Sequence, residues 1–195
     1  MIEINNLCKS YGDKIIFDNF NAIIYEGKKN ILVGQSGRGK TSLIRILLGL
    51  EEYEGKIIGL TGKTLSVVFQ ENRLLENNTV FENFRFIYGE KVNRELLETH
   101  LNSVGLKGIL NKKVKTLSGG MKRRVSIVRG LYLDRDIYIL DEPFKEIDEI
   151  NYLNILKYFE DRSRGKTVIL ASHNSKEIAR YGENIIYINE VSSNE

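Results

Sequence analysis

The stretch that decides the fold is Gly34-Gln35-Ser36-Gly37-Arg38-Gly39-Lys40-Thr41. It fits the phosphate-binding pattern of a glycine, any four residues, and then glycine, lysine and threonine. An apolar run at 31–33 precedes it, and apolar residues at helical spacing follow it from 43 to 48. Because a strand, a glycine-rich loop and a helix follow one another in this order, the stretch predicts a loop that binds phosphate.

Each residue type in this loop has a physical role. Glycines let the backbone curl tightly and turn its N–H groups toward an anion, and the helix N-terminus adds partial positive charge. Lys40 supplies a point charge for the β- and γ-phosphates, and the Thr41 hydroxyl can ligate Mg²⁺. We therefore assign residues 34–42, which include Ser42, to nucleotide binding. A plain glycine-rich turn is the alternative, and the Lys-Thr pair and both flanks argue against it.

The composition is that of an ordinary globular chain. Its 195 residues suit one domain, with 42% hydrophobic and 28% charged residues. Cys8 is the only cysteine, which excludes an intramolecular disulfide and indicates a reducing compartment. No run approaches the roughly 18 apolar residues of a membrane span, and no apolar signal-peptide core follows Met1. A net charge of +3 is too small to indicate nucleic acid, so we expect no nucleic-acid partner.

Residue patterns predict a mixed α/β chain. Alternation at Ile2 and Ile4 predicts an edge strand, the segment 11–14 predicts a turn, and the segment 15–25 predicts a further antiparallel strand. Buried strands are predicted at 31–33, 65–69, 137–140 and 167–171. A final strand is predicted at 185–188 and an amphipathic helix at 150–159.

The middle of the chain has a different pattern. Helical spacing from 71 to 135 predicts a helical subdomain inserted between two parts of an α/β core. We expect a single nucleotide-binding domain over 1–195, with its core at 1–70 and 136–195 and its helical subdomain at 71–135.

Two carboxylates follow the apolar run at 137–140. Asp141 can hold Mg²⁺, directly or through water, and Glu142 can act as a general base on an attacking water. Parallel sheets place ligands at the C-terminal ends of their strands, where this pair is expected. His173, just past the strand at 167–171, can reach a γ-phosphate from the same edge. An acidic pair at an ordinary strand end and a surface histidine are the alternatives.

A second anion site is predicted at Ser118, Gly119 and Gly120. Ser118 is a good N-cap, and its hydroxyl, the glycine N–H groups and the dipole of the following helix can together hold an anion. A chain with two phosphate sites can use one for its own nucleotide and offer the other to the nucleotide of a partner. A simple capped helix is the alternative, and these residues alone favour it.

Three further assignments rest on weaker patterns. Gln70 follows a predicted strand and can ligate Mg²⁺ or water, or can be an ordinary loop amide. Tyr11 can stack on an adenine, or can be a packing aromatic like others of the ten tyrosines. The basic residues near the second anion site are predicted to form a solvated face, and they are Lys112, Lys113, Lys115, Lys122, Arg123 and Arg124.

Taken in order, these motifs resemble the ATP-binding cassette family. Residues 34–41 are similar to its Walker A loop, Gln70 to its Q-loop, and 117–121 to its signature. Residues 137–142 are similar to Walker B with its catalytic glutamate, 143–148 to the D-loop, and His173 to the switch histidine. Near the N-terminus, Tyr11 is similar to the adenine-stacking aromatic. The resemblance spans nearly the whole chain. Residues 67–75 are similar to cassettes of nitrate/sulfonate/taurine importers.

The resemblance implies an α/β fold with a P-loop NTPase (RecA-like) core, an antiparallel β subdomain and an inserted helical subdomain. It implies ATP and Mg²⁺ as ligands, with Thr41, Gln70 and Asp141 at the metal. It also implies a head-to-tail dimer with a second ABC cassette, identical or different, and a separate integral membrane transporter subunit that ATP-dependent closure drives. The implied location is cytoplasmic, peripheral at the inner face of the cell membrane through that partner.

This sequence departs from the family pattern at two places that face the dimer interface in the family. Met121 stands where the signature usually has glutamine, and Lys145-Glu146 replace small residues of the D-loop.

A soluble cassette protein acting on nucleic acid or another assembly is the runner-up function, although such proteins usually carry two cassettes or a long coiled coil. A non-hydrolysing sensor is disfavoured by the intact Lys40 and Glu142. Five apolar residues can form a groove for the membrane subunit or belong to the core, and they are Leu74, Leu75, Val80, Phe81 and Phe84.

Overall fold

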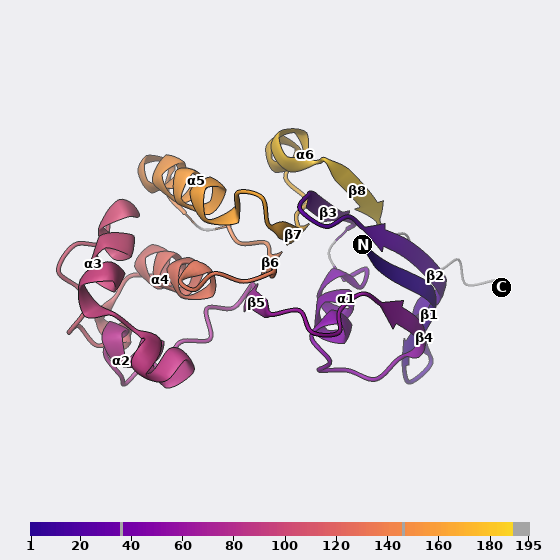
Figure 1. Cartoon of the computed structure of the whole chain (residues 1–195), viewed down its shortest axis with the longest axis horizontal. Coiled ribbons are helices and arrows are strands. Elements are labelled where there is room, and N and C mark those ends of the chain that lie inside the picture. The colour runs from indigo at the N-terminus through magenta and orange to yellow at the C-terminus, as the bar shows by residue number, and fades with distance from the viewer. Residues whose placement is uncertain (36, 146, 189–195) are drawn as a thin grey trace. The chain divides into compact units, whose positions relative to one another are not determined.

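The computed structural model describes residues 1–35, 37–145 and 147–188 of the chain. These residues form two compact units (Figure 1). The first unit consists of Met1–Val67, Arg135–Glu142 and the described residues from Gly165 onward. The second consists of Val68–Asp134 and the described part of Pro143–Arg164.

The first unit contains a three-stranded antiparallel sheet in the order β2-β1-β4. Its strands are β1 (Ile2–Tyr11), β2 (Lys14–Ile24) and β4 (Glu54–Ile58). The prediction of an edge strand at the N-terminus is wrong, because β1 pairs with β2 on one side and β4 on the other. Alternation shows which face of a strand is buried, and it does not show how many neighbours the strand has. The sequence of β4 begins with Glu-Gly-Lys, which have low strand propensity, so β4 was not predicted.

Apart from Val68, the last residue of β5, a five-stranded sheet in the order β5-β6-β7-β3-β8 also belongs to the first unit. Its strands are β3 (Lys29–Val33), β5 (Leu65–Val68), β6 (Ile137–Asp141), β7 (Thr167–Ala171) and β8 (Asn184–Tyr187). β3 is parallel to both β7 and β8, and β6 is parallel to β7. Every residue of β6 and β7 is buried, as is usual for inner strands of a parallel sheet. The loops after β3, β6 and β7 therefore leave the same edge of the sheet.

Two helices pack against this parallel sheet. α1 (Lys40–Leu47) begins at the end of the glycine-rich loop after β3 and packs on β6. α6 (Ser175–Tyr181) follows β7 and packs on β3. The apolar face of α1 is fully buried, with Leu43 and Ile44 at 0% exposure, so the helix holds the loop firmly against the sheet.

The second unit is helical. Its elements are α2 (Val80–Tyr88), α3 (Arg94–Ser103), α4 (Gly119–Leu131) and α5 (Glu149–Ser163), with short 3-10 helices η1 (Gly89–Lys91) and η2 (Val114–Thr116). α4 packs against both α3 and α5. α5 belongs to this unit, although the sequence-based boundaries grouped it with the core, because its contacts with α4 bridge a long gap in sequence. The assignment of 1–195 to one domain stays a prediction. No helix in the described part of the chain is long and apolar enough to cross a lipid bilayer.

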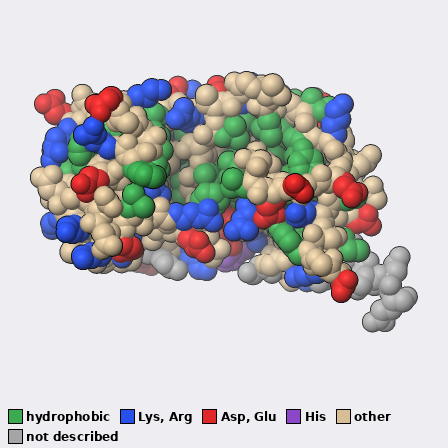
Figure 2. All heavy atoms as spheres, turned by 90° about the horizontal axis from the view of Figure 1, so that it is seen from below, with side chains coloured by type: hydrophobic (Ala, Val, Ile, Leu, Met, Phe, Trp, Pro, Cys, Tyr) green, Lys and Arg blue, Asp and Glu red, His purple; other side chains and the backbone are tan. Residues whose placement is uncertain are grey.

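The predicted basic face of the second unit is only partly on the surface. Arg123 and Arg124 are 3% and 7% exposed, so the interpretation as a solvated face is wrong for these two residues. The remaining exposed members are Lys112, Lys113 and Lys115. On the face that Figure 2 shows, basic side chains are interspersed with acidic ones. Charge of one sign therefore does not dominate that face.

The five groove candidates separate into core and surface residues. Val80 and Phe84 are completely buried within the second unit and belong to its core. Leu75 is 39% exposed, and Leu74 and Phe81 are half-buried. A partner can reach only the last three from outside.

Candidate functional site

The glycine-rich loop joins β3 to α1 through two glycines that have no room for a side chain. Gly39 has φ +104°, and a Cβ atom there would lie 2.7 Å from Ile16 Cγ2 and 3.0 Å from Phe17 Cζ. A Cβ atom at Gly34 would lie 2.7 Å from the Ile188 carbonyl oxygen. The tight loop therefore depends on glycine both for backbone conformation and for close packing. The predicted contact residue Ser36 lies outside the described residues.

We expect Gly39→Ala to destabilise the fold around the loop and to weaken nucleotide binding. A non-glycine residue at this φ costs about 1–3 kcal/mol of unfolding free energy, and the contact with Ile16 adds to it. Gly62→Ala is the matched control, because Gly62 has φ +77° but its Cβ would meet nothing within 4 Å. Urea unfolding of both variants measures the difference. Equal losses of stability would show that contact with Ile16 and Phe17 does not constrain the loop.

Lys40 and Thr41 open α1 and face the acidic end of β6. Lys40 is 6% exposed, and its Nζ donates hydrogen bonds to the carbonyl oxygens of Gly34 at 2.7 Å and Gln35 at 3.1 Å. The Thr41 hydroxyl donates to Asp141 Oδ2 at 2.7 Å. Asp141 is only 2% exposed, so this carboxylate depends on such polar partners for its stability in the interior.

Glu142 and His173 meet at the same edge of the sheet. Glu142 Oε1 lies 2.9 Å from His173 Nδ1 and 4.0 Å from Lys40 Nζ. Glu142 has φ +43°, a strained value for a residue with a side chain. Its backbone N–H donates to the Ala171 carbonyl oxygen at 3.0 Å, which anchors this conformation to β7. Backbone strain of this kind is concentrated at functional sites, so it supports a chemical role for Glu142.

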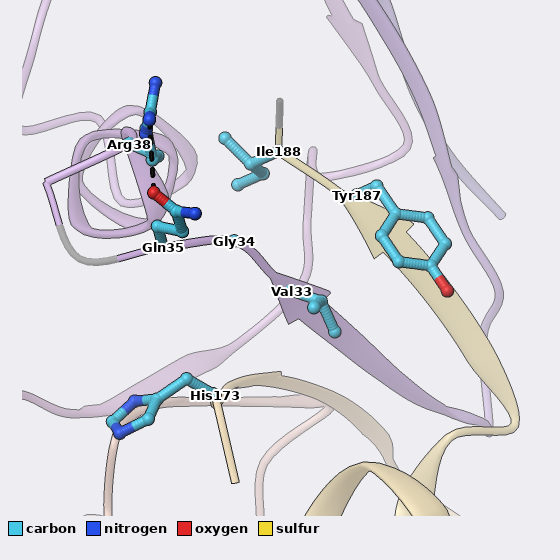
Figure 3. Close-up of a pocket in the computed structure, with 7 residues that line it drawn as sticks. All are labelled: Val33, Gly34, Gln35, Arg38, His173, Tyr187 and Ile188. Atoms are coloured by element: carbon cyan, nitrogen blue, oxygen red, sulfur yellow. Dashed lines mark hydrogen bonds between the residues drawn. The ribbon is translucent and has the colours of Figure 1, made fainter. Parts of the chain in front are cut away.

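A pocket of about 440 Å³ opens beside the loop (Figure 3). Its walls are Val33, Gly34, Gln35 and Arg38 from β3 and the loop, His173 after β7, and Tyr187 and Ile188 at the end of β8. Arg38 donates a hydrogen bond from Nη2 to Gln35 Oε1 at 3.1 Å, which the dashed line in Figure 3 marks. This bond holds the two loop side chains together at the pocket wall.

Tyr11 lies at the end of β1 and is tied to the first turn of α1. Its hydroxyl contacts Ser42 Oγ at 3.3 Å and donates a hydrogen bond to the Glu51 carboxylate. Partial burial and the Glu51 hydrogen bond raise the pKa of the Tyr11 hydroxyl. The ring is 45% exposed, with Lys9 Nζ 4.9 Å from its centre. The Tyr11 hydroxyl is thus anchored while one face of its ring remains accessible. No pattern in the sequence had indicated that Glu51 anchors this hydroxyl.

A buried acid behind His173 was also missed. Glu177 is 6% exposed and accepts a hydrogen bond from Ser172 Oγ at 2.6 Å, and Ser172 Oγ accepts one from the Asn174 N–H at 3.0 Å. Burial raises the pKa of the Glu177 carboxyl. These bonds fix the turn that carries His173. In the sequence, Glu177 shows only as an acidic residue in the first turn of a short helix, and such residues are common at helix N-termini.

The remaining predicted site residues belong to the second unit. Ser118 caps α4, and its Oγ accepts the Met121 N–H at 3.3 Å, so the predicted N-cap is confirmed. Gly119 is exposed, and a Cβ there would meet nothing within 4 Å. Gly120 follows in the first turn of α4. Gln70 is exposed, and its backbone carbonyl accepts a hydrogen bond from Arg123 at 3.0 Å.

Comparison with known proteins shows which family this chain belongs to. The family model described as ABC transporter matches residues 17–145, about two thirds of the chain. This chain belongs to the ABC transporter family. The expected resemblance, the P-loop NTPase fold class and the role as an ATP-hydrolysing, nucleotide-binding transporter subunit are thereby confirmed.

Several curated relatives are about a third identical to this chain over the residues that align. The aliphatic sulfonates import ATP-binding protein SsuB 2 of Burkholderia cenocepacia is 31% identical, over 96% of this chain and 73% of the relative. The phosphonates import ATP-binding protein PhnC of Fusobacterium nucleatum is 32% identical, over 95% of this chain and 87% of the relative. The spermidine/putrescine import ATP-binding protein PotA of Pasteurella multocida is 32% identical, over 96% of this chain but only 55% of the relative.

A solved structure supports the fold independently. The structure described as the ATP binding subunit of an ABC transporter superposes with a TM-score of 0.85 at 23% identity. The match covers 97% of this chain and 86% of that chain. At this identity the likeness concerns the fold alone.

Proposed function

We propose that this ABC transporter subunit binds Mg²⁺-ATP on residues 34–42 and hydrolyses it with Glu142 as the general base. The observation that carries the proposal is the contact between the Thr41 hydroxyl and Asp141, 2.7 Å apart, beside Lys40 and Glu142. A buried ammonium, a hydroxyl and two carboxylates at the carboxyl edge of a parallel sheet suit a nucleotide triphosphate with a divalent cation.

The residues present fit Mg²⁺. This ion prefers hard oxygen ligands, usually binds through one or two protein groups together with substrate phosphates, and neutralises charge that develops during phosphoryl transfer. Thr41 Oγ1 and Asp141 Oδ2 are such oxygens and already lie within hydrogen-bond distance of each other. We assign Gln70 as a further ligand on the family pattern alone.

In the proposed reaction, Lys40 and the backbone N–H groups of the loop hold the β- and γ-phosphates. Glu142 accepts a proton from water as the water oxygen bonds to the γ-phosphorus and the bond to the ADP oxygen breaks. His173 donates a hydrogen bond to the γ-phosphate oxygens as their charge increases. The distance of 2.9 Å between Glu142 and His173 supports joint action on one phosphate. The exposed face of Tyr11 would stack on the adenine.

A second cassette would complete the site. Ser118, Gly119 and Gly120 open α4, a helix of 13 residues whose N-terminus can bind an anion. The exposure of Ser118 and the open space at Gly119 leave room for a phosphate from another chain. We propose that these residues bind the γ-phosphate held by the partner cassette, identical or different, in a head-to-tail dimer. Met121 and Lys145 would lie near that interface, and Glu146 lies outside the described residues.

ATP is therefore expected to drive association of two chains. Glu142→Gln, which should bind ATP without consuming it, is expected to shift to dimer size in gel filtration only when Mg²⁺-ATP is present. The control is the double variant Lys40→Ala/Glu142→Gln, which should remain unshifted because it cannot hold the nucleotide. Light scattering gives the mass of each species. A Glu142→Gln chain that stays monomeric with ATP, both alone and with candidate partner cassettes, contradicts the proposed dimer.

Membership of the family supports a membrane partner and a location at the membrane. We propose that a separate integral membrane subunit docks on this chain and holds it at the cytoplasmic face of the membrane. The relatives are named as import proteins, which supports import as the direction of transport. Partial exposure of Leu74, Leu75 and Phe81 makes them candidates for that contact. We propose no nucleic-acid partner, in keeping with the small net charge of +3.

A further inference from the structure

Arg123 holds two separate chain segments with one buried guanidinium. The residue lies on α4, five positions after the cap Ser118, and is 3% exposed. Its Nη1 donates to the carbonyl oxygens of Phe69 at 2.7 Å and Gln70 at 3.0 Å. Its Nε donates to the carbonyl oxygen of Pro143 at 2.7 Å. The planar guanidinium thus fixes three backbone acceptors at set positions relative to α4.

The segments that Arg123 binds lie where the chain passes between the two units. One passage is between Val67 and Val68, just before Phe69 and Gln70, and another is between Glu142 and Pro143. Pro143 has a fixed φ and follows Glu142 directly, so a hydrogen bond to its carbonyl oxygen restrains the residue next to Glu142. Glu142 itself has the strained φ of +43°, which neighbouring structure must maintain.

We propose that Arg123 is a positioning residue for ATP hydrolysis. It ties the helix that Ser118 caps to the backbone carbonyl of Gln70 and to the carbonyl of Pro143, the residue directly after Glu142. Any movement of α4 is therefore passed to both segments through one rigid group. This inference rests on the proposed function, because it assumes that Glu142 is the base and that Ser118 opens a phosphate site.

Arg162 provides a matched control on the same unit. Its Nε donates to the Leu131 carbonyl oxygen at 2.9 Å and its Nη2 to the Tyr132 carbonyl oxygen at 3.0 Å. Like Arg123, it joins two segments of the second unit by hydrogen bonds to backbone carbonyls. Unlike Arg123, it binds neither the Gln70 segment nor the residue after Glu142. A purely structural role for such arginines would give similar results for both.

The test compares Arg123→Gln, Arg123→Lys and Arg162→Gln in the full chain. We expect Arg123→Gln to keep near-normal ATP affinity by calorimetry while single-turnover hydrolysis slows by about 10- to 100-fold, the usual effect of a misplaced catalytic group. In the steady state, kcat should fall with little change in KM. Arg123→Lys, which keeps the charge but lacks the planar fork, should lie between wild type and Arg123→Gln. Arg162→Gln should lower the unfolding midpoint and leave the single-turnover rate close to wild type.

Two outcomes overturn the proposal: a wild-type rate in Arg123→Gln, or an equal loss of rate in Arg162→Gln. If Arg123→Gln does not fold, Arg123→Lys is judged by the same criterion, because the proposal depends on the fork. Glu142→Gln is measured in parallel. A wild-type rate in Glu142→Gln contradicts the proposed function itself, whereas a slow Glu142→Gln with a normal Arg123→Gln contradicts only the positioning role.

Discussion

Replacing Lys40 with alanine is expected to remove most ATP binding. Lys40 is 6% exposed, and its ammonium donates hydrogen bonds to the carbonyl oxygens of Gly34 and Gln35 in the loop. A buried charged contact to phosphate contributes about 2–5 kcal/mol, so the dissociation constant should rise roughly 30- to 5,000-fold. Isothermal titration calorimetry with Mg²⁺-ATP measures the change directly.

The control for Lys40→Ala is Lys28→Ala. Lys28 belongs to the same unit and is exposed, with its Nζ 3.3 Å from Glu183 in a surface ion pair. Its loss removes the same charge without touching the loop, and surface pairs of this kind contribute little. We expect wild-type affinity from it. Near-normal ATP binding by a folded Lys40→Ala chain would contradict the assignment of the phosphate-binding loop.

The Glu142→Gln chain is expected to bind ATP and to hydrolyse it about 10²–10⁴-fold more slowly, as for loss of a general base. Glutamine keeps the shape of the side chain but cannot accept the proton of the attacking water. Its amide can still contact His173, 2.9 Å from the present carboxylate oxygen, so the loop after β6 should keep its conformation. Single-turnover hydrolysis of prebound ATP separates this chemical step from binding.

His173→Ala tests whether the pair acts on one step. Loss of a hydrogen bond that strengthens in the transition state should also slow turnover. Because Glu142 and His173 contact each other, the double variant should be less impaired than the product of the two single effects. A wild-type rate in Glu142→Gln means that the base lies elsewhere. A wild-type rate in His173→Ala leaves the assignment of Glu142 as the base intact and contradicts the role proposed for His173.

Local patterns predicted local structure well: the strand before residue 34, the helix after residue 39 and the N-cap Ser118 are confirmed, whereas phosphate binding by the loop stays a prediction. The loop at 34–41 was identified because phosphate binding needs glycines, a lysine and a hydroxyl at fixed spacing on one short segment. Ser118 was identified as an N-cap because capping depends on residues within one turn. The strands at 137–140 and 167–171 were found because fully buried parallel strands are uniformly apolar.

Features that depend on distant partners were not predictable in this way. β1 is a central strand because β4 pairs with it, and nothing in the first ten residues reports that neighbour. Arg123 and Arg124 resemble a solvated basic run, yet both are buried, because carbonyl oxygens from remote segments replace the water they lose. Glu51 and Glu177 became visible as anchors only through their contacts with Tyr11 and Ser172.

The sequence by itself therefore determined the fold class and the family, and it predicted which residues bind phosphate and metal, because each of these depends on residue types at short spacing. Only the tertiary structure decided how these residues meet. Thr41 and Asp141 are 100 positions apart, and Glu142 and His173 are 31 apart, yet both pairs are in hydrogen-bond contact. Parallel pairing of β6 with β7 and packing of α1 on β6 bring the ends of these elements to one edge. Hydrogen bonds and burial between distant segments set that geometry, and no local pattern contains it.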